Sequence, residues 1–311
     1  MEVAFERIKE AGDASVFRGD PRLSIGDADD WWNSLLSTVE PPSQRPYLYG
    51  ADAGMCARKN VFHSVNTWVP FDKNAASVGY MALGDALENM LAKGLADKGR
   101  LVAQNMRLVE MPSLKVSGKM DLIFSDNKDE LRLAEIKSCG QLPTEPKTGH
   151  LAQVQMYAAV SGFDRVWLTY ISRNIRNSYG PKISMKTFEV TVTEDVIRTR
   201  LEIAALSMLA SLHKKLPPKS AHFRKSQECL YCPFLDFCWG KVDSGLPEMS
   251  PETYAKFAKV ARRVAGNLVD KRQSRYIRTL KACWKLLEPG PLKGIVLDEL
   301  TQARLALAST L

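Results

Sequence analysis

The chain has 311 residues, of which 45% are hydrophobic and 25% are charged. This length allows one substantial core with an appendage, or two domains, and the composition is typical of a globular protein. No apolar run approaches the roughly 20 residues that a membrane-spanning helix needs. The first residues lack the basic-then-apolar order of a signal peptide, so we expect a cytoplasmic protein with no membrane partner.

The net charge is +8, and the excess is concentrated near the C-terminus. Residues 251–285 hold ten Lys or Arg and two acidic residues, which accounts for the whole excess. Such a segment suits a polyanion such as DNA. The alternative is an ordinary solvated helix face.

Periodicity and turn signals predict the elements in chain order. An acidic, aromatic helix over 27–39 ends at Pro41-Pro42. The elements that follow are a helix over 78–95, a strand over 101–110, a hairpin with its turn at 125–130, a helix over 150–160, strands over 165–171 and 187–192, and a helix over 194–212. This order indicates an α/β fold with a mixed sheet flanked by helices. Residues 250–311 are expected to be helical.

Acidic residues open and occupy the two strands of the hairpin. Asp121 follows Gly118 on the first strand, and Glu135-Ile136-Lys137 lies on the second. Side chains alternate along a strand, so Glu135 and Lys137 should share a face, with Asp121 brought beside Glu135. Two carboxylates bind a hard divalent cation, and a neighbouring ammonium stabilises developing negative charge. The alternative is a set of ordinary charged residues on an exposed strand face.

Three further polar residues occur on predicted helices. Glu88 faces the apolar side of its helix, where a carboxylate is costly unless it is paired or bound to metal; the alternative is a boundary residue that reaches water. Gln153 and Tyr157 are spaced i, i+4 and share one face. They could orient a phosphate or support Lys137, although a Tyr on a half-buried helix is also common.

The cysteines are clustered. Cys229-x2-Cys232-x5-Cys238 supplies three closely spaced thiolates, and Cys56 is the best candidate for a fourth. Four thiolates suit zinc or an iron–sulfur cluster, and the spacing does not choose between them. The alternative is three cysteines without a metal.

Taken together, these residues resemble the RecB-like branch of the PD-(D/E)XK nucleases, and within it the iron–sulfur subgroup. That subgroup includes CRISPR-adaptation exonucleases and the AddB nuclease domain. Cys56-Ala57-Arg58-Lys59 is similar to the family's Cys-x-Arg element, and Gly84–Glu88 falls where the family has Gly-x-x-x-His. The other motifs follow in the family's order.

The resemblance implies a Mg²⁺- or Mn²⁺-dependent DNA exonuclease acting on single strands or DNA ends in recombination, repair or CRISPR adaptation. Its metal ligands would be Glu88, Asp121, Glu135 and the Ile136 carbonyl. Lys137, Gln153 and Tyr157 would complete the catalytic set. A 4Fe–4S cluster, or zinc as the lesser possibility, would be held by the four cysteines, and Arg58 and the basic tail could hold the strand.

We therefore expect an N-terminal accessory region over 1–46, a RecB-like nuclease domain with its cluster over 47–245, and a basic helical extension over 246–311. Partners would be DNA and proteins of recombination or CRISPR adaptation. Two other functions are open: a non-catalytic DNA-binding scaffold with a structural four-cysteine site, and a structure-specific endonuclease on the same fold.

Overall fold

The protein is described here by a computed structural model. The residues that the structure describes are 38–39, 48–53, 56–65, 72–73, 75–111, 114–173, 184–219, 229, 232–241 and 243–309. The chain divides into two compact units, residues 1–41 with 70–82, and residues 42–69 with 83–311.

The first unit contains the end of the helix predicted over 27–39. Residues 27–37 lie outside the described part of the chain. The last two residues of the predicted helix form a strand instead, β1 (Thr38–Val39), which pairs antiparallel with β3 (Asp72–Lys73). Both Thr and Val are β-branched and favour extended backbone, so the helix prediction is wrong at this end.

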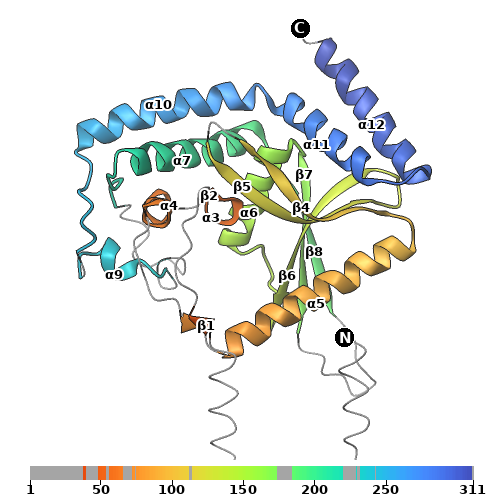
Figure 1. The fold of residues 1–311 in the computed structure, drawn as a ribbon, viewed down its shortest axis with the longest axis horizontal. Helices are drawn as coiled ribbons and strands as arrows, with labels where there is room; N and C mark the ends of the chain where they lie inside the picture. Colours follow the sequence, from red (N-terminus) through yellow and green to blue (C-terminus); the bar gives the residue numbers. More distant parts are fainter. Residues whose placement is uncertain are drawn as a thin grey trace, which may run out of the picture. The chain divides into compact units, whose positions relative to one another are not determined.

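The second unit is built on a six-stranded mixed sheet (Figure 1). Its strands are β2 (Leu48–Tyr49), β4 (Leu101–Met111), β5 (Val116–Ser125), β6 (Leu131–Cys139), β7 (Arg165–Ser172) and β8 (Met185–Thr191). The order is β2-β5-β6-β7-β8, and β4 pairs with β5. β2–β5 and β6–β7 are parallel pairs, whereas the others are antiparallel. The predicted α/β mixed sheet and its β5–β6 hairpin are confirmed.

Helices surround this sheet. They are α3 (Gly50–Ala53), α4 (Ala57–Ser64), α5 (Ala75–Asp97), α6 (Thr148–Ser161), α7 (Glu194–Leu212), α9 (Leu235–Cys238), α10 (Pro251–Val269), α11 (Arg272–Leu286) and α12 (Pro291–Ala308). α5, α6 and α7 agree with the predicted helices to within three residues at each end. None of the described helices is long and apolar enough to cross a membrane.

The two faces of the sheet have different helical covers. Ala92 of α5 packs with Leu122 and Ala134 on one face. On the other face, Met156 of α6 joins Leu133 in the main core. α7 packs on α6, and α10 runs along α7 (Figure 1).

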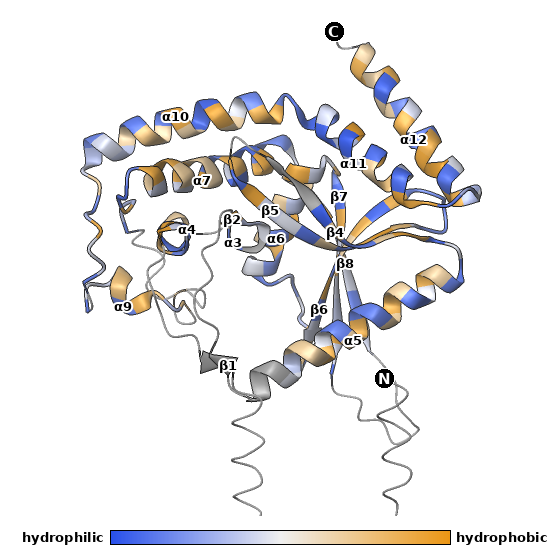
Figure 2. Cartoon of the chain, in the orientation of Figure 1, coloured by the Kyte–Doolittle hydropathy of each residue, from blue (hydrophilic) through white to orange (hydrophobic). Residues whose placement is uncertain are grey.

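The C-terminal helices share the main core. α10 starts at a Ser250 cap, whose hydroxyl accepts a hydrogen bond from Thr253 N–H, and it has apolar and hydrophilic sides (Figure 2). Its Ala261 and Ala265 are buried with Leu280 of α11. Removing residues 251–311 would therefore expose the core as well as remove charge. The three-part division at residues 46 and 245 stays a prediction.

Candidate active site

Asp121 lies where one edge of β5 changes partner. That edge pairs with β2 through Val116 and Ser117, and with β6 from Leu122 onward. Between these stretches the Asp121 side chain reaches β6, because its Oδ2 accepts a hydrogen bond from the Ile136 N–H at 2.7 Å. The parting of the strands therefore leaves room for a carboxylate inside the sheet.

Glu135 is the most buried acidic group of the site, with 2% of the residue exposed. Its Oε1 accepts hydrogen bonds from Lys137 Nζ at 2.5 Å and from Gln153 Nε2 at 2.7 Å. Its Oε2 is buried and has no hydrogen-bond partner within the described part of the chain. A buried carboxylate oxygen without a partner is costly, and a bound cation would satisfy it.

The carboxyl groups act on one another. Burial, and then the charge of Glu135, raise the pKa of Asp121 from 3.8 to about 7. Burial also raises the pKa of Glu135, and the charge of Glu88 adds to this. Lys137 and a hydrogen bond with Asp121 oppose the rise in the pKa of Glu135. Buried carboxyl groups with raised pKa values are stabilised in their ionised forms by a divalent cation.

Glu88 approaches this pair from α5. Its pKa is raised by burial and then by Asp121, and its Oε1 accepts a hydrogen bond from Gln104 Nε2 at 3.4 Å. Among the described residues, however, no three His, Cys, Asp or Glu side chains are grouped so that they could hold a metal ion. Glu88 is therefore electrostatically coupled to Asp121 and Glu135 without being gathered with them into one ligand set.

Lys137 is a charged neighbour of the carboxylates. Burial lowers its pKa, but the charge and the hydrogen bond of Glu135 raise the pKa by more, so that it lies above the usual lysine value. Lys137 therefore holds its proton, which suits it to stabilise negative charge.

Gln153 and Tyr157 come from the face of α6 that covers the site. Gln153 Nε2 also donates a hydrogen bond to the Tyr157 hydroxyl at 2.9 Å. The Tyr157 ring packs so closely on β5 that a Cβ at Gly118 would lie 2.7 Å from the ring atom Cε1. Only glycine at position 118 leaves this space, so the Gly that precedes Asp121 admits the tyrosine.

Two residues beside Lys137 were not singled out from the sequence. Tyr170 is the direct β7 partner of Lys137, and its hydroxyl lies 3.0 Å from His150 Nδ1 and accepts a hydrogen bond from Lys147 N–H. Burial, and then the charges of Lys137 and Lys147, lower the pKa of His150 to about 4, so this ring is neutral. The parallel register of β6 and β7 was the signal that could have located Tyr170.

The four clustered cysteines interact across the fold. Burial raises the pKa of Cys56, and the charges of Cys238 and Cys229 raise it further. Cys232 likewise has a raised pKa, with burial first and Cys56 and Cys229 among the causes. The thiols therefore lie near one another. Among the described residues, however, no three cysteines are grouped so that they could hold a metal ion.

Arg58 has a different place from the one expected. It is 4% exposed, and its guanidinium donates hydrogen bonds to the Pro217 carbonyl, to Glu248 and to the Cys238 carbonyl. A buried guanidinium with these partners is not available for phosphate. Arg58 instead ties α4 to the segments on either side of the cysteine cluster.

Comparisons with known proteins identify a family and several solved structures of low similarity. Residues 59–239 match the PD-(D/E)XK nuclease superfamily, whereas no curated protein sequence matches the chain. The fold resembles that of SSO0001, with 19% identity and a TM-score of 0.40 over 71% of this chain and 98% of that chain. It also resembles the alkaline exonuclease LHK-Exo from Laribacter hongkongensis, with 12% identity and a TM-score of 0.40 over 60% of this chain and 93% of that one. The complex of LHK-Exo with dAMP gives 13% identity and a TM-score of 0.39 over the same shares.

The family match spans more than half of the chain. It includes the carboxylate site, from Glu88 on α5 to Tyr157 on α6, and it ends after Cys238.

Proposed function

Because this chain belongs to the PD-(D/E)XK nuclease superfamily, we propose that it is a divalent-metal-dependent exonuclease that hydrolyses phosphodiester bonds at the ends of DNA strands. The observation that carries the proposal is the buried Glu135, which binds Lys137 through one oxygen and leaves the other without a partner among the described residues.

The proposed metal ligands are Asp121, Glu135 and the Ile136 carbonyl, with Glu88 as a further ligand that would have to move toward the other two carboxylates. Mg²⁺ or Mn²⁺ suits such oxygen donors. The buried Glu135 Oε2 and the raised pKa values of the carboxyl groups support this assignment. When bound, such a cation lowers the pKa of a water ligand and polarises the scissile phosphate.

The chain's own residues then have distinct roles. Lys137, which holds its proton, stabilises the negative charge that develops on the phosphate. Gln153 fixes Glu135 through its hydrogen bond, and Tyr157 fixes the Gln153 amide. Gln153 and Tyr157 are thus positioning residues in the proposed mechanism.

DNA binding is proposed for the basic face of α10 and α11. Eight of the ten basic residues in 251–285 are exposed, whereas Arg275 is buried and donates a hydrogen bond to the Leu268 carbonyl. Contacts of exposed Lys and Arg with phosphates are salt-sensitive and independent of sequence. The exposed residues are Lys256, Lys259, Arg262, Arg263, Lys271, Arg278, Lys281 and Lys285.

The four-cysteine group is proposed to hold a 4Fe–4S cluster, with zinc as the alternative. Cys238 and Cys229 raise the pKa of Cys56, and Cys56 and Cys229 raise the pKa of Cys232, which supports a common site. The likeness of the motifs to iron–sulfur nucleases supports a use in recombination, repair or CRISPR adaptation. The cluster would add a second connection, beside the Arg58 hydrogen bonds, between α4 and the segments on either side of the cysteines.

The test compares linear and circular single-stranded DNA, with the linear strand labelled at its 5′ or 3′ end, and a linear duplex. Protein purified without oxygen is incubated with each DNA and Mn²⁺, beside Glu135→Gln, which keeps the shape of the side chain and removes its charge. Shortening of linear strands with circles left intact supports the exonuclease, and the label gives its polarity. Cutting of circles indicates an endonuclease, and tight binding without any cleavage indicates a scaffold.

A further inference from the structure

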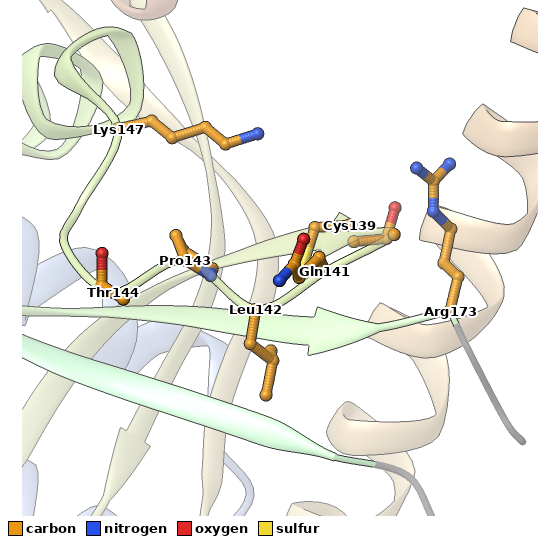
Figure 3. A pocket seen from close by; sticks show the side chains of 9 residues that line it. Cys139, Gln141, Leu142, Pro143, Thr144, Lys147 and Arg173 are labelled. Carbon is orange, nitrogen blue, oxygen red and sulfur yellow. The ribbon is translucent and has the colours of Figure 1, made fainter.

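A hollow of about 490 Å³ opens beside the carboxylate site, at the carboxyl ends of β6 and β7 (Figure 3). Its wall includes Ser138 and Cys139 of β6, the loop residue Thr144, Lys147 at the start of α6, and Arg173 just after β7. This volume is in the range of small-ligand sites.

The topology favours a ligand at this place. β6 and β7 are parallel neighbours, and α6 connects them, so the three elements form a β-α-β unit. Ligands of open α/β sheets bind outside the carboxyl ends of such strands.

The hollow is also positively charged. Lys147 and Arg173 flank it from opposite sides (Figure 3), and none of the described side chains that line it is acidic. Within the described residues, Lys147 Nζ has no ion-pair partner. Burial raises the pKa of Cys139, whereas the charges of Lys147 and Arg173 oppose this rise, so both cations act on the same wall.

The hollow adjoins the proposed reaction centre. Cys139 follows Lys137 by two residues, which is about 7 Å along a strand. The Tyr170 hydroxyl accepts a hydrogen bond from Lys147 N–H, and Tyr170 pairs with Lys137. The start of α6 is therefore attached to the strand that lies beside the catalytic lysine.

We propose that this hollow binds the phosphate of the nucleotide next to the scissile bond, held by Lys147 and Arg173. The inference rests on the proposed function and names a subsite for the same substrate. Two cations select a phosphate, and the volume leaves space for the attached sugar. The subsite would set how far the strand advances past Lys137.

The test measures binding in EDTA, so that it does not depend on cleavage. The variants are Lys147→Gln and Arg173→Gln, with Lys147→Arg as the charge-retaining form. Lys93→Gln, which alters an exposed lysine of α5 paired with Asp97, is the matched control. The probes are thymidine 5′-monophosphate, thymidine, and single strands with a 5′-phosphate, a 3′-phosphate or neither.

We expect the wild-type protein to bind thymidine monophosphate and not thymidine. Each Gln variant should weaken binding of that nucleotide by about tenfold and flatten the salt dependence of strand binding by about 0.7 per lost contact. Lys147→Arg should restore both. A preference for one terminal phosphate identifies an end-binding subsite, and equal binding of all strands identifies an internal phosphate.

The proposed subsite would be overturned if Lys147→Gln and Arg173→Gln bound the nucleotide as tightly as Lys93→Gln does, with the same salt dependence of strand binding. In that case, cleavage of DNA by wild-type protein would leave the proposed nuclease function standing. Conversely, loss of nucleotide binding in the Gln variants of a protein that cuts no DNA would support the subsite and reject the exonuclease.

Discussion

Replacing Asp121 with Asn should make the metal-free protein more stable at pH 8. Burial and the charge of Glu135 raise the pKa of Asp121 from 3.8 to about 7. The folded protein thus keeps a proton that the unfolded chain releases near pH 4, so its stability falls as the pH rises from about 4 to about 7. A shift of about three units is worth about 4 kcal/mol above pH 7. Asn removes this repulsion and can still accept the Ile136 N–H.

The assay is urea unfolding in EDTA at pH 8 and at pH 5. The Asn variant should be more stable than the wild type at pH 8, by up to about 4 kcal/mol, and the difference should narrow at pH 5. Mn²⁺ should then stabilise the wild type and not the variant.

Asp126→Asn is the control of opposite sign. Burial raises the pKa of Asp126, but its hydrogen bonds, led by that from Arg132, lower it by more, so the ionised form stabilises the fold. This variant should lose stability at pH 8. An Asp121→Asn protein that is no more stable than the wild type at pH 8 would show that the ionised Asp121 carboxylate does not destabilise the fold.

Three further outcomes are expected. Gly118→Ala should lower the midpoint of thermal unfolding, because the added methyl group meets a tyrosine ring, at a cost of about 1–3 kcal/mol; an unchanged midpoint would contradict the packing. Cys232→Ala should lose iron, measured by absorption and metal analysis, together with stability; the same metal content and stability as the parent would reject the cluster. Lys259→Glu combined with Arg263→Glu should weaken DNA binding and flatten its salt dependence, whereas unchanged binding would assign α10 to an ordinary solvated face.

The sequence was most informative where structure is set by neighbouring residues. The helix over 194–212 was predicted with its observed bounds, because Thr193 caps its first turn and apolar residues recur along it. The period of two along β6 predicted that Glu135 and Lys137 share a face, and their side chains are in contact. Turn chemistry between the two strands likewise predicted the β5–β6 hairpin.

Local sequence patterns did not predict the contacts between segments that are distant in the sequence. Arg58 was expected to hold phosphate, but it is buried against Pro217, which lies 159 positions away. Helical spacing predicted the C-terminal helices but not that Arg275 would point into the core. The Gln104 bond to Glu88 depends on how α5 lies against β4. Each of these depends on tertiary packing, which local periodicity does not encode.

The proposed nuclease activity is tested most directly by cleavage of end-labelled linear DNA by the wild-type protein and by Lys137→Ala, with Mg²⁺ or Mn²⁺ and with EDTA. We predict cleavage that requires the metal and falls by about 10²–10⁴ in the variant, while both proteins bind DNA in EDTA. Equal cleavage by the two proteins would contradict the role of Lys137, and no cleavage by the wild type with any metal would contradict the nuclease activity.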